Sequence, residues 1–339
     1  MKYNYIVIGN WKKNGLLDYY NYAFSEANEL NNSILDNYYF PKLKINQLIY
    51  RFHFSPKINN ILGLPFKYLW VKKRINRYLK VFKSESNICF ILLSDSLKYE
   101  KYGISKIIKE KYPNSKIIYF FSDLVSKDKN KEEFLTNYRY IADLIYSFDY
   151  DDAKKHNLKF HNVPFSDLSG LFDNVEQKYD VSFVGQAKDR LEEIISAYKA
   201  LKKQNLKLCF YIIGVPKEKQ VFADEINYCD FIPYKEYLNI EAESKCILEI
   251  IQKGSKGNTL RVYEAISLNK LLISNNIMLK QNPCYDSKYM RVYDNLDEID
   301  VKAFIDSNKD VHYENKKELY PSAFFKHIEK DLKEMEINN

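Results

Sequence analysis

One loop and the helix behind it hold the residues whose types and spacing best suit the binding of a phosphorylated ligand. The segment runs from Lys253 to Ala265 and reads KGSKGNTLRVYEA. Gly257, Arg261 and Glu264 are spaced by four and three residues, so a helix would carry them on one face. Asn258 is a favourable helix N-cap. Because free N–H groups at a helix start attract phosphate, we expect a diphosphate to bind there.

The polar groups of this segment have separate expected roles. The backbone of Gly257 and Thr259 would cradle the phosphates, and Lys253 would add positive charge. Arg261 would contact phosphate or support the helix, and Glu264 would accept hydrogen bonds from a ribose diol. A simpler alternative is an ion pair between Arg261 and Glu264, which stabilises a helix by roughly 0.2–0.5 kcal/mol. The loop matches neither a Walker A motif nor a G-x-G-x-x-G fingerprint, which argues against P-loop NTPases and dinucleotide-dependent dehydrogenases.

Two other segments place polar residues at the carboxyl ends of expected strands, where open α/β sheets bind ligands. Gly185 ends one strand and lets a ligand approach closely, and Arg190 could pair bidentately with phosphate. The alternative there is a tight turn with a surface arginine. Glu249 lies in the apolar run 246–251, where a carboxylate needs a partner or a wet cleft. We expect Glu249 to orient Arg261 or a sugar hydroxyl; the alternative is an edge strand with Glu249 in solvent.

The elements that must position these residues alternate between short apolar runs and helical patterns, which is typical of parallel α/β sheets. The runs are apolar throughout, as expected where helices cover both faces of a sheet. In the first half the pattern predicts strands at 5–8, 45–50, 88–93, 116–121 and 144–148, and helices near 16–30, 58–83, 101–111 and 128–142. In the second half it predicts strands at 180–184, 206–213, 246–251 and 271–274, and helices at 187–203, 234–244, 258–268 and 316–335.

Length and composition favour two ordinary globular domains. The chain has 339 residues, of which 46% are hydrophobic and 29% charged. A polar, aperiodic stretch around 157–180 separates the two α/β patterns. We therefore expect an N-terminal domain over 1–165, a C-terminal domain over 166–315 and a last helical segment over 316–339.

Cysteine and histidine spacing argues against a metal site. The five cysteines include no C-x-x-C pair, which predicts reduced thiols in a cytoplasmic protein. The five histidines include no H-x-x-x-H pair, and the chain offers no zinc-ligand spacing. No stretch of about 18 apolar residues predicts a membrane span. We expect no metal and no cofactor.

The C-terminal half resembles the donor domain of GT-B glycosyltransferases, especially bacterial enzymes of capsule, exopolysaccharide and lipopolysaccharide assembly. The resemblance rests on DVSFVG at 180–185 followed by RLE at 190–192, on GNTLRVYEA at 257–265 and on LNKLLISN at 268–275. Residues 145–154 resemble the end of the first domain in these proteins. The rest of the N-terminal half shares only the α/β rhythm.

The resemblance implies two Rossmann-like domains that face each other across a cleft, with the final helix crossing back to the first domain. The C-terminal domain would bind a nucleotide-sugar and the N-terminal domain the acceptor. Glu264 matches the family's ribose-binding glutamate. Many retaining members carry another glutamate eight residues earlier, where this chain has Lys256, so the stereochemical outcome stays open. These enzymes generally need no metal, and Asp149 and Asp151 fit a loop better than a metal-binding D-x-D.

An inverting transfer would need a base near the acceptor hydroxyl in the first domain. Asp123 follows the expected strand 116–121, and Asp95 follows the expected strand 88–93. The resemblance favours Asp123, although either aspartate could instead cap a helix. The loop at 9–15 could line the cleft beside them.

Residues 66–83 combine an apolar helical face with seven cations and no acid. Such a helix can lie on anionic lipid, a contact that a transferase acting on a lipid-linked glycan would need. The alternatives are a core helix with a solvated basic face and a nucleic-acid surface, and the single localised patch disfavours the second. The expected membrane or acceptor face comprises Trp70, Lys72, Lys73, Arg74 and Arg77.

Together these features predict a glycosyltransferase, of the hexosyltransferase class, that moves a sugar from a nucleoside-diphosphate donor to a lipid-linked surface glycan. Its expected partners are the nucleotide-sugar, the glycan acceptor and the anionic inner face of the plasma membrane, with no nucleic acid. The alternative is a non-catalytic partner of the same fold that binds a glycan or activates another transferase.

Overall fold

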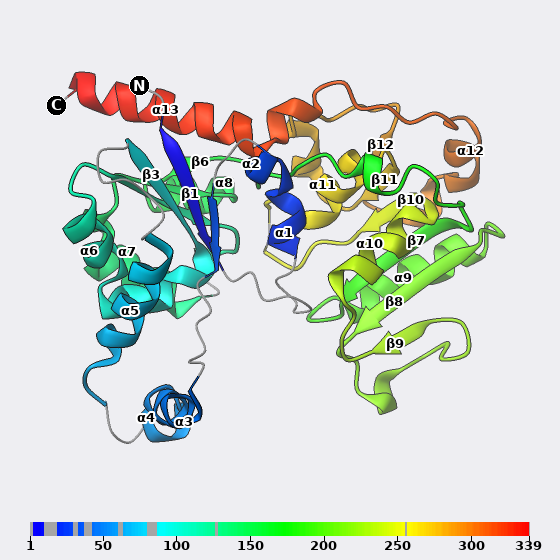
Figure 1. Ribbon diagram of the computed structural model, residues 1–339. Coiled ribbons are helices and arrows are strands. Elements are labelled where there is room, and N and C mark those ends of the chain that lie inside the picture. The colour runs from blue at the N-terminus through cyan, green and yellow to red at the C-terminus, as the bar shows by residue number, and fades with distance from the viewer. Residues whose placement is uncertain are drawn as a thin grey trace.

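The computed structural model describes residues 3–9, 19–29, 33–36, 43–59, 64–79, 87–125, 128–254 and 256–338. They form two lobes, each built on a parallel six-stranded sheet (Figure 1). The strand order is β2-β1-β3-β4-β5-β6 in the first sheet and β12-β11-β10-β7-β8-β9 in the second. These sheets, with helices packed on them, confirm the predicted doubly wound α/β class.

The first sheet lies within residues 1–165. Its strands are β1 (Asn4–Gly9), β2 (Ser33–Asp36), β3 (Ile88–Leu93), β4 (Lys116–Phe121), β5 (Leu144–Ser147) and β6 (Lys159–Phe160). The helices of this lobe are α1 (Tyr19–Ala23), α2 (Ser25–Glu29), α3 (Lys44–His53), α4 (Pro56–Asn59), α5 (Lys67–Leu79), α6 (Ile104–Lys111), α7 (Lys129–Asn137) and α8 (Tyr150–Lys155). β3 and β4 have the predicted bounds because both are continuous apolar runs that the sheet buries.

The second sheet lies within residues 166–315. Its strands are β7 (Tyr179–Gln186), β8 (Leu208–Ile213), β9 (Asn227–Cys229), β10 (Ser244–Glu249), β11 (Leu271–Ser274) and β12 (Met290–Val292). The helices are α9 (Leu191–Lys202), α10 (Tyr234–Ala242), α11 (Leu260–Ser267) and α12 (Val301–Asp306), and α13 (Pro321–Asn338) follows. The short strands β2, β6, β9 and β12 escaped prediction because two to four residues give almost no periodicity.

The strand predicted at 45–50 is wrong, because these residues belong to helix α3. Its apolar residues Ile45, Leu48 and Ile49 have the spacing of one helical face. None of the residues of α3 is buried, so sheet packing does not favour the extended form there. The spacing of these apolar residues, rather than their number, therefore indicates the helix.

Helix α13 returns to the first lobe and runs along one end of it (Figure 1). The ring of Tyr5 in β1 stacks on Phe325 at 4.2 Å, and its hydroxyl donates a hydrogen bond to the Phe325 carbonyl. Tyr146 in β5 donates to Asp331 at 2.6 Å. The last helix therefore ties the end of the chain to the first sheet. Among the described residues no helix is both long and apolar enough to cross a membrane.

Candidate functional site

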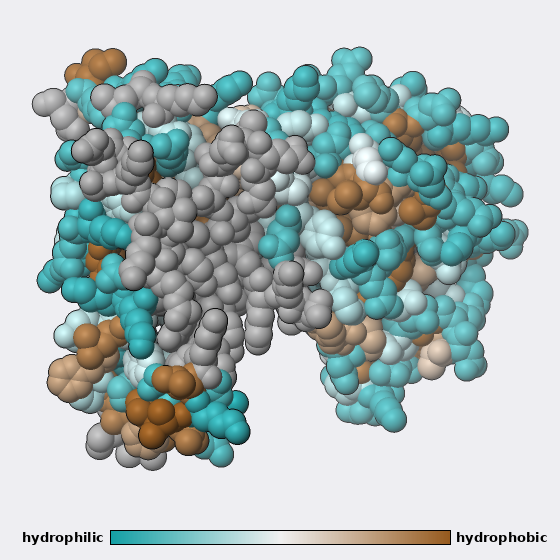
Figure 2. Space-filling view, in the orientation of Figure 1, coloured by the Kyte–Doolittle hydropathy of each residue, from teal (hydrophilic) through white to brown (hydrophobic). Residues whose placement is uncertain are grey.

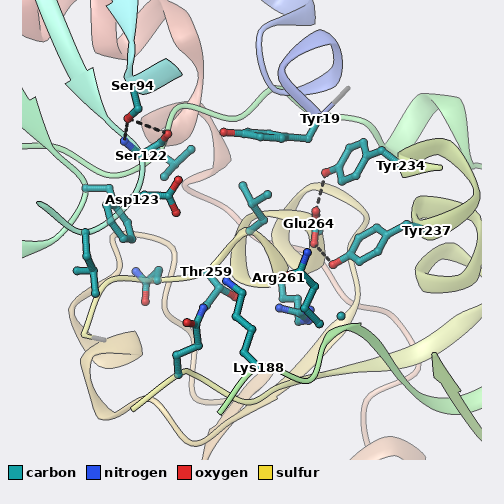
Figure 3. A pocket seen from close by; sticks show the side chains of 18 of the residues that line it. Tyr19, Ser94, Ser122, Asp123, Lys188, Tyr234, Tyr237, Thr259, Arg261 and Glu264 are labelled. Atoms are coloured by element: carbon teal, nitrogen blue, oxygen red, sulfur yellow. Dashed lines mark hydrogen bonds between the residues drawn. The ribbon is translucent and has the colours of Figure 1, made fainter. Parts of the chain in front are cut away.

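A cavity of about 630 Å³ lies between the two lobes, where loops follow the carboxyl ends of strands from both sheets. The first lobe contributes Ser94, Ser122 and Asp123 to its wall. The second lobe contributes Arg261 and Glu264 among others. Figure 3 shows these two groups on opposite sides, with the ring of Tyr19 between them. Parallel strands from two sheets thus bring residues far apart in the sequence to one site.

Two buried arginines line this cavity and pack against the ring of Phe183. The guanidinium carbon lies 6.0 Å from the ring centre for Arg190 and 5.1 Å for Arg261. Arg190 donates to the carbonyls of Gln186 and Ile250, and Arg261 donates to the carbonyl of Val184. Within the described part of the chain, no carboxylate oxygen lies within 4.0 Å of either guanidinium. The alternative of an ion pair between Arg261 and Glu264 is therefore wrong.

The electrostatics of this pair favour an anion. Burial, followed by the nearby charge of Arg261, lowers the pKa of Arg190 to about 10. Arg190 and Arg261 are 4% and 8% exposed, so water solvates them poorly. Burial acts to lower the pKa of Arg261 as well, but Tyr237 and the carboxylates of Glu264, Glu241 and Glu249 raise it. Arg190 is therefore the less compensated of the two charges, and a bound anion would offset the cost of burying it. The structure thus brings the two predicted arginines together and excludes the surface-arginine alternative for Arg190.

Gly185 leaves space for the guanidinium group of Arg261 rather than for a ligand. A Cβ atom at this position would lie 3.0 Å from the guanidinium carbon of Arg261 and closer still to one of its nitrogens. The expected close approach of a ligand to Gly185 is therefore replaced by the close approach of Arg261. The glycine sets where the guanidinium lies at the end of β7.

Replacing Gly185 by alanine should weaken nucleoside-diphosphate binding about tenfold, because the added methyl group displaces the Arg261 guanidinium from the cavity wall. The melting temperature should change little, since the displaced group is the far end of a flexible side chain. Titration calorimetry with nucleoside diphosphates and a thermal melt check the two parts. Unchanged affinity would show that the position of Arg261 is unimportant.

Glu249 holds the start of helix α11. Its carboxylate accepts hydrogen bonds from the Thr259 N–H at 3.0 Å and hydroxyl at 2.6 Å, and from the Ser274 hydroxyl. The side chain is completely buried, and β10 lies between β7 and β11. The alternative of an exposed edge strand is wrong. Glu249 also does not bond Arg261 directly, and it acts instead on the helix that carries Arg261.

The loop before α11 differs from the expected phosphate cradle. The Gly257 N–H donates to the carboxylate of Asp149 at 2.9 Å, and a Cβ at Gly257 would lie 2.8 Å from Cδ2 of Phe148. Gly257 therefore packs the loop against the first lobe, and its N–H is not available to phosphate. Thr259, not Asn258, is the N-cap residue, and its N–H also has a partner in Glu249.

Other groups at this helix start lack a hydrogen-bond partner within the described residues. Asn258 lines the cavity, and the buried Oδ1 atom of this side chain has no hydrogen-bond partner among the described residues. The N–H groups of Leu260 and Arg261, the first two residues of α11, likewise have no acceptor in the described chain, as is usual for a first helical turn. The start of α11 could thus still bind an anion, through N–H groups that lie one to two residues after Thr259.

Lys253 lies outside the cavity. It is exposed, and its ammonium group lies 3.5 Å from Glu193. Lys256 is likewise turned outward and pairs with Asp151 at 2.6 Å. Two lysines line the cavity, Lys131 in the first lobe and Lys188 in the second, and Figure 3 shows Lys188 near Thr259 and Arg261. Lys188 follows the same strand as Gly185, so the rule that ligands bind at strand ends could have found it.

Glu264 is completely buried at the back of the cavity wall. Its two carboxylate oxygens accept hydrogen bonds from Tyr234 at 2.5 Å and from Tyr237 at 2.6 Å (Figure 3). Burial raises the pKa of Glu264, whereas the two hydroxyls and Arg261 act in the opposite direction. Both tyrosines line the cavity, and their rings stack at 5.3 Å. Sequence reasoning missed them because the abundance of tyrosine, 30 residues, gave no single one any weight.

A second buried carboxylate, Glu241, lies next to this group. Neither of its oxygens has a hydrogen-bond partner among the described residues, and it is 1% exposed. Burial, together with the negative charge of Glu264, raises its pKa well above the usual range. An acid of this kind destabilises the fold as pH rises above its unfolded pKa of about 4.5, because the folded state resists losing the proton.

Glu241→Gln should therefore raise the melting temperature at pH 8, by about 2 °C, and should raise it less at pH 5. The amide keeps the shape of the protonated acid and cannot ionise. Thermal melts of both proteins from pH 5 to pH 8 measure this difference. A gain that is equal at both pH values would contradict the buried ionisation.

The first-lobe wall is held by short polar contacts. The Ser94 hydroxyl accepts from the Ser122 N–H at 2.9 Å, and the Ser122 hydroxyl lies 2.9 Å from that of Tyr20. Lys131, almost fully buried, donates to the Asp123 carbonyl at 2.8 Å, and burial lowers the pKa of Lys131. The exposed side chain of Asp123 lines the cavity opposite Thr259 and Arg261 (Figure 3).

The remaining predictions from the sequence concern Asp95, the loop at 9–15 and Asp149. The side chain of Asp95 and the loop residues 10–15 lie outside the described residues. Asp149 accepts from the N–H groups of Asp152 and Gly257, so it caps α8 and joins the lobes, in agreement with a loop role. No group of three possible metal ligands occurs among the residues that the structure describes.

The predicted membrane or acceptor face lies on α5. Trp70 packs against α3, and its indole N–H donates to His53 at 2.9 Å, so it is an internal contact of the lobe. Lys72 and Lys73 are exposed, and Lys72 lies 3.5 Å from Glu110. The side chains of Arg74 and Arg77 lie outside the described residues.

Comparison with known proteins gives a fold but no close relative. No protein-family model and no curated protein sequence matches the chain. An α-glucosyltransferase solved with UDP and a 13-mer DNA superposes with a TM-score of 0.60 at 11% identity, covering 97% of this chain and 98% of that one. A UDP-forming α,α-trehalose-phosphate synthase from Burkholderia xenovorans superposes with a TM-score of 0.54 at 10% identity, covering 98% and 99%. The chain thus has the GT-B fold of these glycosyltransferases over nearly its whole length.

Proposed function

We propose that the protein is a glycosyltransferase that takes a sugar from a nucleoside-diphosphate donor. The observation that carries this proposal is the pair of buried guanidiniums, Arg190 and Arg261, which line an interlobe cavity and have no carboxylate oxygen within 4.0 Å among the described residues. Arginine forks match phosphate oxygens, and the cavity lies where α/β sheets bind ligands. The GT-B fold is the setting in which such a site would serve glycosyl transfer.

The donor diphosphate would lie against these two arginines, Lys188 and the first N–H groups of α11. When the bond between the sugar and the phosphate breaks, negative charge grows on the departing diphosphate. Fixed positive groups stabilise that charge without a metal ion, which is the role we propose for them. The ribose would lie beside Glu264, with Tyr234 and Tyr237 as the groups that meet it first.

The acceptor hydroxyl would approach from the first lobe, where we propose Asp123 as the base. Its carboxylate would take the proton while the acceptor oxygen attacks the anomeric carbon. Asp123→Asn should lower turnover by about 100-fold or more while nucleotide affinity stays the same. An equal loss of both would assign Asp123 to donor binding instead.

We further propose a UDP-sugar as donor and a lipid-linked surface glycan as acceptor. UDP appears in the descriptions of both solved structures above, and this supports the choice of base. The basic residues of the first lobe support an acceptor held at an anionic membrane surface, as in capsule or lipopolysaccharide assembly.

A thermal-shift panel of UDP, GDP, ADP, TDP and CMP tests the proposal. A ligand that binds only the folded state stabilises it by about 2.7 kcal/mol at 100 times its Kd, so one nucleoside diphosphate should raise the melting temperature clearly. Release of that diphosphate from its nucleotide-sugar then tests transfer. If no nucleotide stabilises the protein, the donor site is absent and the non-catalytic partner becomes the better hypothesis.

A further inference from the structure

Helix α3 presents an apolar stripe to solvent. Its residues Ile45, Leu48, Ile49 and Phe52 follow the spacing of one helical face. Their side chains are 68, 67, 43 and 51% exposed, respectively. Figure 2 shows hydrophobic side chains gathered at this end of the first lobe, and Figure 1 places α3 and α4 at the end remote from α13. A contiguous exposed apolar surface of this kind marks an interaction site.

The opposite face of α3 is already packed on the lobe. Tyr50 makes an edge contact with Trp70 of α5 at 5.6 Å, and His53 accepts the indole hydrogen bond of Trp70. Phe54, next to the helix end, makes an edge contact with Tyr102 at 5.8 Å. These contacts fix the orientation of α3. The stripe therefore faces outward although the helix is docked.

The sequence segment that contains the stripe carries only positively charged residues. Residues 37–83 contain eight lysines and three arginines and no aspartate or glutamate. This net charge of +11 exceeds the +7 of the whole chain, so the rest of the protein is net negative. Lys44 and Arg51, both exposed, lie seven residues apart on α3 itself, and Lys57 on α4 is also exposed. Cations thus flank the apolar side chains along the helix.

We propose that the α3 stripe and its flanking cations form a docking surface for an anionic lipid bilayer. The apolar side chains would enter the boundary between headgroups and acyl chains, and the lysines and arginines would meet the lipid phosphates. This differs from the α5 face expected from the sequence, because α3 provides most of the apolar contact and α5 adds charge together with the exposed side chains of Tyr68 and Leu69. The proposal does not depend on the nucleotide site.

Charge and apolar exposure together favour lipid over the other possible occupants. A second copy of the chain would bring an equally positive surface against this one, and the two would repel. A nucleic acid would use the cations but would leave four apolar side chains in water. A bilayer with anionic headgroups satisfies both features at once.

Co-sedimentation with vesicles tests the proposal. The full chain should bind vesicles containing about 30% phosphatidylglycerol in phosphatidylcholine and should bind pure phosphatidylcholine at least about tenfold more weakly, with affinity falling as salt rises. The double variant Leu48→Asn/Phe52→Asn should lose about tenfold or more in affinity for the anionic vesicles. Lys44→Gln/Arg51→Gln should lose affinity for anionic vesicles only.

A matched control replaces exposed apolar residues of the other lobe. Leu171 and Ile277 are 65% and 59% exposed, and Leu171→Asn/Ile277→Asn should bind vesicles like the unchanged chain. Circular dichroism should show that all variants fold. Their thermal shift with nucleoside diphosphates should match the unchanged protein, so failure of vesicle binding and failure of the proposed function are separate results.

Three outcomes would overturn the proposal. The first is no binding to anionic vesicles, or equal loss in the control and the α3 variant. The second is binding to duplex DNA at the same salt with no binding to vesicles, which would assign the surface to nucleic acid. The third is a protein that does not bind vesicles but forms a dimer, and whose dimer the Leu48→Asn/Phe52→Asn substitutions dissociate.

Discussion

Replacing Arg261 by glutamine should weaken nucleoside-diphosphate binding about 100-fold. Arg261 is buried, lines the cavity and has no carboxylate oxygen within 4.0 Å in the described chain, so a bound diphosphate could pair with its guanidinium directly. Loss of one partner of a buried, hydrogen-bonded charge pair costs about 2–5 kcal/mol. Titration calorimetry with the nucleotide that stabilises the protein most measures the change. The melting temperature of the free protein should also fall, because the buried acids Glu264 and Glu241 lose a nearby positive charge and the Val184 carbonyl loses a donor.

Two further variants make this result specific. Arg261→Lys keeps the charge and loses the planar fork, so its affinity should lie between those of the unchanged protein and the glutamine variant. Arg139 is a control arginine outside the cavity that also donates to a backbone carbonyl, that of His156. Arg139→Gln should bind nucleotide normally. If Arg261→Gln binds like the unchanged protein, Arg261 does not hold the diphosphate.

Replacing Glu249 by alanine should destabilise the protein by about 3 kcal/mol and abolish detectable nucleotide binding. The buried carboxylate accepts from Thr259 twice and from Ser274, and its removal leaves three donors without an acceptor in a closed space. The first turn of α11, which carries Arg261, would then lose its anchor to β10. Thermal melting and calorimetry measure the two effects.

The control for this variant is Glu236→Ala, which removes an exposed acid from α10. It should leave both the melting temperature and nucleotide affinity unchanged, as expected for a surface site. Glu249→Gln should lie between the two, because its amide keeps one acceptor oxygen but replaces the other by a donor. A melting temperature of Glu249→Ala equal to that of the unchanged protein would show that this carboxylate does not stabilise α11.

The sequence predicts most of the fold because buried parallel strands are continuous apolar runs. β3, β4 and β11 have the bounds that the sequence predicts, because most of their residues are apolar and buried. The prediction is wrong at α3, where four of the six residues 45–50 are hydrophobic but none of the helix is buried. It also missed β2, β6, β9 and β12, whose pairing depends on neighbouring strands rather than on local pattern.

The sequence predicts which residues lie at the site better than it predicts the contacts that these residues make. The sequence placed Arg190, Arg261 and Glu264 in one cavity, because strand ends and helix starts attract ligands. The sequence could not show that the carboxylate of Asp149, 108 residues away, accepts a hydrogen bond from the Gly257 N–H. Nor could the sequence show that the Tyr234 hydroxyl donates a hydrogen bond to Glu264, because that contact depends on how α10 packs on α11.

The most direct test of the diphosphate site is a crystal structure of the protein with UDP bound. The phosphate oxygens should lie within hydrogen-bond distance of the guanidinium groups of Arg190 and Arg261 and close to the first N–H groups of α11. A nucleotide bound elsewhere, or one in this cavity whose phosphates touch neither guanidinium, would contradict the proposed site.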